Sequence, residues 1–176
     1  MYPIKFEPHQ LTVEKLSPEH DLSNFNCSDE DISKVNEFIQ EQALKYQNEN
    51  MGVTHLFFYK DEIVGFVTLS MTYIEGKEAP DEGDLAYFGN KKPPSMLIGQ
   101  LGVDNIVRRR GLGRLLCDWC EGIAIELNKK VGCRYLVLHT ERELIQFYEK
   151  CGFITKKPNK KSPLMVKKIL SLSELE

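Results

Sequence analysis

The segment Leu101–Arg114 (LGVDNIVRRRGLGR) most constrains what this chain can fold into. A β-rich run, Ser95–Val103, leads through a turn with two glycines into a run with helical spacing, Gly113–Lys130. The N–H groups at a helix start, together with the helix dipole, attract an anion. The glycines remove side chains, so the backbone can approach that anion closely. The segment therefore predicts a strand, a phosphate-binding turn and a helix in an α/β domain.

Four arginines lie around this turn, and they favour a diphosphate over a single carboxylate: Arg108, Arg109, Arg110 and Arg114. The sequence lacks the GxxxxGK[ST] pattern of P-loop NTPases and the GxGxxG fingerprint of dinucleotide-binding folds, which disfavours both classes. A helix start with surface arginines and no ligand stays open from this segment alone.

The other segments predict a single mixed α/β domain over residues 1–176. Runs with strand character are Phe6–Leu16, Val53–Lys60, Ile63–Thr72, Tyr135–Thr140 and Leu164–Leu170. Runs with helical character extend from an N-cap at Ser28 to Gln47, and over Leu144–Cys151 with Gly152 as the C-cap. Asp61-Glu62 predicts a tight hairpin, and Gly76–Pro94 predicts a long loop. This order predicts a sheet with helices on its faces.

Composition supports a globular protein. The 176 residues are 41% hydrophobic and 28% charged, which suits one domain and argues against a disordered chain. No apolar run approaches the roughly 20 residues of a membrane span, so no membrane partner is expected. The start (MYPIKFEPHQ) lacks an apolar signal core, and the five cysteines show no framework spacing. A cytoplasmic location is expected.

The net charge of -3 hides an asymmetry. Residues 1–104 carry 8 Lys and Arg against 18 Asp and Glu, whereas residues 105–176 carry 15 against 8. An acidic front and a basic back indicate two electrostatic roles, or simply a solvated surface.

Two motifs resemble those of the GCN5-related N-acetyltransferases (the GNAT family). Arg108–Gly113 (RRRGLG) resembles the family's acetyl-CoA motif, (Q/R)xxGx(G/A), and Leu101–Val103 (LGV) resembles the strand end before it. Phe147–Phe153 (FYEKCGF) resembles the family's FYxxxGF motif. Spacing and element order agree over at least Val53–Ile169. Two motifs in the right order are a strong signal.

The resemblance implies a GNAT fold, which is a mixed, mostly antiparallel sheet splayed at the fourth strand with helices on both faces. It implies acetyl-CoA as cosubstrate and no metal. Pantetheine would bind the strand end, and the pyrophosphate would bind the turn. The implied binding residues are Leu101, Gly102, Val103, Arg108, Arg109, Arg110, Gly111, Leu112, Gly113 and Arg114.

The resemblance also implies direct transfer, in which an amine attacks the thioester carbonyl and expels the CoA thiolate. Tyr148 falls on the family's motif tyrosine and is the candidate acid for the thiolate, because a phenol keeps its proton at neutral pH. The Leu101 N–H is the candidate donor to the oxyanion. The fourth strand, Met96–Val103, has no carboxylate to serve as base. His139, at the end of the fifth strand, is either a base or a structural residue.

The acceptor is an amine, expected to be that of a small molecule, a polyamine or a peptide. The acidic segment Glu78–Asp84 would attract a cationic amine. The front half, however, resembles toxins of this family in Phe25–Cys27 (FNC) and Asp61–Ser70 (DEIVGFVTLS). That branch acetylates the α-amine of aminoacyl-tRNA and is paired with a small antitoxin. The low pKa of such an amine would fit the missing base.

Other interpretations stay open or fail. Cys117 and Cys120 form a CxxC, but no second pair completes a zinc site, and their helix favours packing. A non-catalytic CoA-binding or interaction module with the same fold is an alternative, which the glycines and Tyr148 disfavour. A homodimer is compatible with the sequence.

Overall fold

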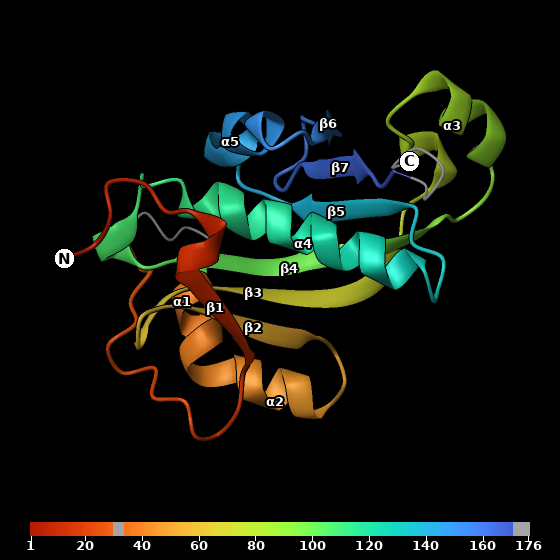
Figure 1. Cartoon of the computed structure of the whole chain (residues 1–176). Helices are drawn as coiled ribbons and strands as arrows, with labels where there is room; N and C mark the ends of the chain where they lie inside the picture. Colours follow the sequence, from red (N-terminus) through yellow and green to blue (C-terminus); the bar gives the residue numbers. More distant parts are fainter. Residues whose placement is uncertain (30–33, 171–176) are drawn as a thin grey trace. The chain divides into compact units, whose positions relative to one another are not determined.

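The computed structural model describes residues 1–29 and 34–170 (Figure 1). Seven strands are ordered β1-β2-β3-β4-β5-β7-β6 in one sheet. The residues group into two compact units, Met1–Ser70 with Gly99–Cys117, and Met71–Ile98 with Asp118–Glu176.

The strands of the first unit form an antiparallel meander. β1 (Leu11–Lys15) follows a 3-10 turn at Pro8–Gln10 and pairs with β2 (Val53–Tyr59), which pairs with β3 (Glu62–Tyr73). The predicted hairpin is confirmed one residue earlier than expected, because Lys60 adopts a φ of 56° and Glu62 already belongs to β3. The left-handed backbone of Lys60 lets the chain reverse within this short connection.

The helical segment of the first unit begins later than predicted. It comprises α1 (Val35–Glu37), a π-helical turn (Phe38–Gln42) and α2 (Ala43–Asn48). Ser28 does not cap it, because Lys34 precedes its first residue and the Ser28 N–H donates to the Asn26 side chain. Residues 30–33, which the prediction placed in the first turn of this helix, lie outside the described residues.

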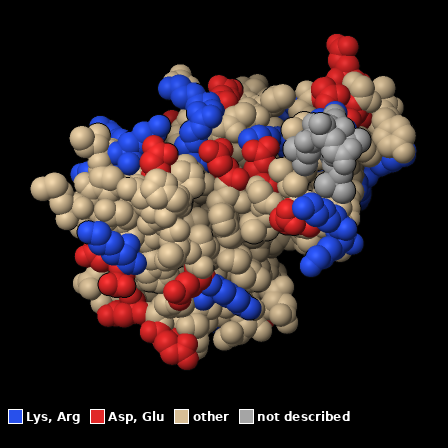
Figure 2. Space-filling model, in the orientation of Figure 1, with Lys and Arg blue, Asp and Glu red and all other residues tan. Residues whose placement is uncertain are grey.

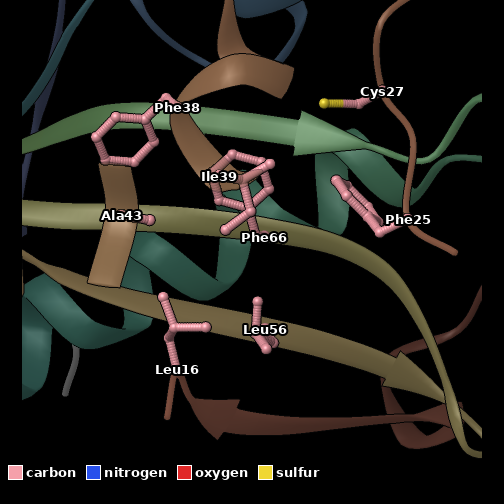
Figure 3. Packing of buried hydrophobic residues seen from close by; sticks show 8 residues of the cluster. All are labelled: Leu16, Phe25, Cys27, Phe38, Ile39, Ala43, Leu56 and Phe66. Atoms are coloured by element: carbon pink, nitrogen blue, oxygen red, sulfur yellow. The ribbon is translucent and has the colours of Figure 1, made fainter. Parts of the chain in front are cut away.

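The core of the first unit joins these helices to the sheet. Figure 3 shows Phe38, Ile39 and Ala43 of the helical segment beside Leu56 of β2 and Phe66 of β3. Phe25 and Cys27 belong to the same buried cluster, and the rings of Phe25 and Phe66 lie 5.9 Å apart in an edge-to-face contact. The cluster therefore holds the segment before the first helix against the sheet.

The second unit contains the parallel strand pair. β4 (Pro94–Val103) pairs in parallel with β5 (Tyr135–His139) over Ser95–Leu97. The connection between them includes α4 (Leu112–Asn128), as parallel strands require a crossover. β7 (Leu164–Lys168) pairs antiparallel with both β5 and β6 (Ile154–Lys156). The prediction of a mixed, mostly antiparallel α/β sheet is confirmed, and the splay at β4 and helices on both faces stay predictions.

The prediction of a long loop between β3 and β4 was wrong. It folds into a 3-10 turn (Gly76–Glu78) and a helix, α3 (Glu82–Phe88). The Asp81 side chain accepts a hydrogen bond from the Asp84 N–H at 2.8 Å and caps that helix. The sequence did carry a signal for this helix, because the capping Asp81 precedes Leu85 and Phe88, which are spaced as on one face of a helix.

The last helix, α5 (Ile145–Lys150), is shorter than predicted because Arg142–Leu144 forms a 3-10 turn. Gly152 follows with a φ of 88°, which confirms its role in ending the helix. Among residues 1–29 and 34–170, no helix is long and apolar enough to cross a membrane.

Candidate active site

The glycine turn of the first unit is built around a buried aspartate. β4 ends at Val103, a 3-10 turn follows at Asn105–Val107, and α4 begins at Leu112. The Asp104 carboxylate accepts hydrogen bonds from the N–H groups of Ile106 and Asn26, both at 2.9 Å. Asp104 is 5% exposed, so these bonds fix the path of the turn. Sequence reasoning missed this residue.

Two residues of the turn have a left-handed backbone. Arg109 has a φ of 61° and Gly111 a φ of 80°. Left-handed residues in a turn direct neighbouring N–H groups to one side and form a concavity for an anion. Gly111 is exposed, and it lies directly before the first turn of a 17-residue helix. The geometry therefore fits the pyrophosphate site that the motif predicts.

The arginines of the turn have different surroundings. Arg108 donates from its guanidinium to the backbone carbonyls of Cys27, at 2.8 Å, and Asp29. Arg110 donates to the Pro3 carbonyl at 2.7 Å. Arg109 and Arg114 are exposed. Two of the four guanidinium groups thus hold backbone segments while keeping their positive charge.

The glycine in the strand end has a packing role. A Cβ on Gly102 would lie 2.5 Å from the Phe66 ring and 3.1 Å from the Cys27 sulfur. Gly102 is buried, whereas Leu101 and Val103 are half-buried. Gly102 is therefore required for the close approach of Phe66, and the backbone of Leu101 and Val103 stays the predicted contact for pantetheine.

We expect Arg108→Lys to lower the free energy of unfolding by about 1–2 kcal/mol, because an ammonium cannot bind both carbonyls as the planar guanidinium does. The dissociation constant for acetyl-CoA should rise less than about tenfold. Urea unfolding and calorimetric titration measure the two effects, and Arg109→Lys is the exposed control. A variant of full stability that no longer binds acetyl-CoA would show that Arg108 acts on the cosubstrate instead.

Tyr148 lies in α5 of the second unit with its side chain held by neighbours. It is 7% exposed, and its ring contacts those of Phe147 and Phe153, with centroids 4.9 Å and 5.9 Å away. Its carbonyl accepts a hydrogen bond from the Phe153 N–H at 3.1 Å. The FYxxxGF motif thus forms one aromatic cluster that fixes the orientation of the phenol.

A cavity of about 380 Å³ lies in the same unit. Its wall includes Leu97 of β4, His139 at the end of β5 and Thr72 at the end of β3. Glu78 also lines it and forms an ion pair with Lys157, which reaches in from the segment after β6. His139 is exposed, so its imidazole is accessible to an acceptor. The cavity is the candidate acceptor site on this unit.

Three of the four carboxylates in the acidic segment before β4 are paired with bases, whereas Glu82 is exposed. Asp84 is 6% exposed and accepts hydrogen bonds from Arg134 and from the Tyr135 hydroxyl, the latter at 2.7 Å. Lys168 lies 3.1 Å from Asp81 and 3.3 Å from Asp84. Figure 2 shows acidic and basic side chains beside each other over the visible face. These carboxylates therefore serve the fold.

Burial alone would raise the pKa of Asp84, but hydrogen bonds from Arg134, Tyr135 and Lys168 outweigh it and hold that pKa below its ordinary value. A carboxylate with a lowered pKa stabilises the fold above the ordinary carboxyl pKa of about 4. That stabilisation is lost as the pH falls through the lowered pKa.

We expect Asp84→Asn to lower the free energy of unfolding at pH 7 by about 2 kcal/mol, because Arg134 and Lys168 lose their counter-charge. The difference from the wild type should shrink as the pH falls from about 4 through the lowered pKa of Asp84, because the wild-type carboxylate becomes protonated over that range. Urea unfolding across this pH range provides the measurement, with exposed Glu82→Gln as control. Equal stability at pH 7 would contradict a structural role.

The CxxC pair does not form a reactive site. Cys117 and Cys120 are 1% and 0% exposed, and burial raises the pKa of the Cys120 thiol. Within the described parts of the chain, no three His, Cys, Asp or Glu residues are placed to hold a metal ion. Packing is the role of these cysteines.

A model of the acetyltransferase (GNAT) family matches residues 17–153, and this chain belongs to that family. It is an acetyl-CoA-dependent N-acetyltransferase. No curated protein sequence matches it significantly.

Solved structures share its fold. A tyrosine-to-phenylalanine mutant of KacT superimposes with a TM-score of 0.80 at 22% identity, covering 95% of this chain and 99% of that one. AtaT in complex with acetyl-methionyl-tRNAfMet gives 0.76 at 20% identity, covering 88% and 93%. The KacTA–DNA complex gives 0.73 at 24% identity, covering 94% and 98%. At these identities the likeness establishes the fold.

Proposed function

We propose that this acetyltransferase transfers the acetyl group of acetyl-CoA to the α-amine of aminoacyl-tRNA. The FNC and DEIVGFVTLS segments resemble the branch of the family with this acceptor. The fold of AtaT, which was solved with acetyl-methionyl-tRNAfMet, supports the same choice.

The observation that carries the choice of acceptor is the pairing of the acidic segment. Glu78 pairs with Lys157, Asp81 with Lys168, and Asp84 with Arg134. A polyamine would need exposed carboxylates to steer its positive charges, and bases pair with three of the four carboxylates of this segment. The α-amine of an aminoacyl ester has a lowered pKa, so it is largely neutral and requires neither a carboxylate partner nor a strong base. This acceptor fits the absence of a carboxylate in β4.

We propose a role in acetyl transfer for a feature of each unit, the glycine turn of the first and Tyr148 of the second. The N–H groups from Arg109 to Gly113 bind the pyrophosphate, and the positive φ values of Arg109 and Gly111 support this role. The Leu101 N–H donates to the thioester oxygen as charge develops on it. The Tyr148 hydroxyl gives its proton to the departing thiolate. Acetyl-CoA supplies the acyl group when it is bound.

A small-molecule, polyamine or peptide amine is the second candidate, and the cavity with its accessible His139 favours it. His139 would accept the proton of a more basic amine. The other catalytic roles in this reaction would be those proposed above.

An acceptor panel distinguishes the two functions. Thiol release from acetyl-CoA is followed with charged tRNA, uncharged tRNA, spermidine and lysine-containing peptides. The proposed function predicts turnover with charged tRNA alone. Turnover with spermidine or peptides, and none with charged tRNA, would contradict it and select the second candidate.

The proposed acceptor implies a cytoplasmic site of action and a neutralising partner. AtaT has been solved with the C-terminus of the antitoxin AtaR, and KacTA with DNA. By this resemblance we propose that a small antitoxin binds this chain. Co-expression should relieve a growth defect that the wild type causes and that a Tyr148→Phe variant lacks.

A further inference from the structure

Two exposed tyrosines and two consecutive lysines form a continuous surface on the second unit, which we call the aromatic–lysine rim: Tyr73, Tyr87, Lys91 and Lys92. Tyr73, at the end of β3, is 52% exposed, and Tyr87, on α3, is 67% exposed. Tyrosine is enriched at interfaces, because its ring is apolar and its hydroxyl is polar. Both lysines are exposed as well.

Each lysine of the rim lies over one of the rings. The Lys91 ammonium is 3.7 Å from the centre of the Tyr87 ring, and the Lys92 ammonium is 4.7 Å from that of Tyr73. Because the lysines are neighbours in sequence, the two ring–cation pairs are adjacent. Each cation lies over one face of its ring.

Backbone hydrogen bonds hold the segment after Tyr73 against the segment that carries Lys91 and Lys92. The Gly76 N–H donates to the Lys91 carbonyl at 2.9 Å, and the Ile74 N–H donates to the Pro93 carbonyl at 3.4 Å. A Cβ on Gly76 would lie 2.0 Å from the Phe88 carbonyl oxygen, so only glycine permits this approach of α3. The rim is therefore a preformed surface.

The rim is continuous with the candidate acceptor cavity, because Tyr73 lines that cavity. The charge of this region also differs from what its sequence suggests. Glu78, Asp81 and Asp84 are paired with basic residues, so they offset the rim lysines little, whereas Glu82 on α3 is exposed. Glu75 lies 4.0 Å from Lys92, and Lys77 adds another exposed cation. A basic, aromatic surface thus leads to the cavity.

We propose that the aromatic–lysine rim binds the single-stranded 3′ end of the acceptor RNA, with its bases stacked on Tyr73 and Tyr87 and its phosphates on Lys91 and Lys92. Exposed aromatic rings with neighbouring cations are how proteins bind single strands without reading their sequence. The strand end would then enter the cavity past Tyr73. This inference rests on the proposed function, since it requires an RNA acceptor.

The test compares a full acceptor with a minimal one. Initial rates are measured with charged tRNA and with an aminoacyl-adenosine, which carries the same α-amine but lacks the preceding nucleotides. Tyr87→Ala should raise the KM for charged tRNA about tenfold, as expected for loss of one stacked base, and leave the KM for aminoacyl-adenosine unchanged. Tyr87→Phe keeps the ring and should restore the wild-type KM.

The lysines are tested by salt dependence. Lys91→Gln with Lys92→Gln should reduce the slope of log affinity against log salt for an oligonucleotide of the tRNA 3′ end by roughly 1.4. Lys130→Gln, an exposed lysine after α4, is the matched control and should leave the slope unchanged. Thermal unfolding of each variant establishes that the fold is intact.

The outcomes separate the two proposals. A wild type that acetylates charged tRNA, with Tyr87→Ala and the double lysine variant within twofold of it, overturns the rim and leaves the proposed function standing. A wild type that acetylates no charged tRNA overturns both. Rim variants that lose only the binding of a co-expressed antitoxin would show that the surface holds a protein, which also contradicts the inference.

Discussion

Gly111→Asp is expected to raise the dissociation constant for acetyl-CoA at least about 100-fold, which corresponds to about 2.7 kcal/mol. The new carboxylate would lie in the turn where the pyrophosphate is proposed to bind, and like charges there repel. The fold should survive. The nearest atom to an added Cβ is the Lys5 Cγ at 3.5 Å, and aspartate is among the residues that tolerate a left-handed backbone.

The matched control is Gly122→Asp within α4. An added Cβ there meets nothing within 4 Å, so the same change of glycine to aspartate should leave acetyl-CoA binding intact. Calorimetric titration of both variants with acetyl-CoA measures the effect. Wild-type affinity in Gly111→Asp would show that the pyrophosphate binds elsewhere.

Tyr148→Phe is expected to lower kcat about 100-fold with little change in the KM for acetyl-CoA, because it removes the proton donor to the thiolate. The phenyl ring keeps the contacts with Phe147 and Phe153, so the fold should change little. Steady-state thiol release measures kcat and KM together.

Tyr135→Phe provides the contrast to that variant. The Tyr135 hydroxyl binds Asp84 rather than a substrate, so its loss should lower stability by about 1 kcal/mol and leave kcat near the wild-type value. If Tyr148→Phe retained full kcat, the phenol would not be the acid, and water would have to protonate the thiolate.

The fold was predictable where local chemistry decides it. The hairpin at Lys60, the glycine turn at Gly111 and the helix end at Gly152 all depend on residues that adopt a left-handed backbone. α3 was missed because a seven-residue helix with a glycine and two acids in its first turn has weak periodicity, and its capping aspartate is the main mark of its start. The start of the first helix was predicted too early. Ser28, Asp29 and Asp31 are all residue types that cap helices, so the sequence did not single out one start.

The candidate site was predictable only in part. Its motifs named the turn and Tyr148, and the structure gives both a suitable local geometry. The role of Arg108 depends on carbonyls of Cys27 and Asp29, about 80 residues earlier in the chain, and no local pattern reveals such partners.

The charge asymmetry was also misleading, because the sequence does not show which charges pair in the fold. Counted along the sequence, the acidic front and basic back were separate fields. In the structure, Lys168 and Arg134 from the basic half neutralise Asp81 and Asp84 from the acidic half. Folding therefore removes much of the attraction for a cationic acceptor, and the exposed lysines near α3 become the relevant charges.

The most direct test of the proposed acceptor is the mass of the aminoacyl-adenosine that nuclease digestion releases from charged tRNA after incubation with acetyl-CoA and the full chain. The proposed function predicts a gain of one acetyl group on the α-amine, and no gain with Tyr148→Phe over the same time. An unmodified aminoacyl-adenosine, under conditions where the protein acetylates spermidine or a peptide, would contradict it.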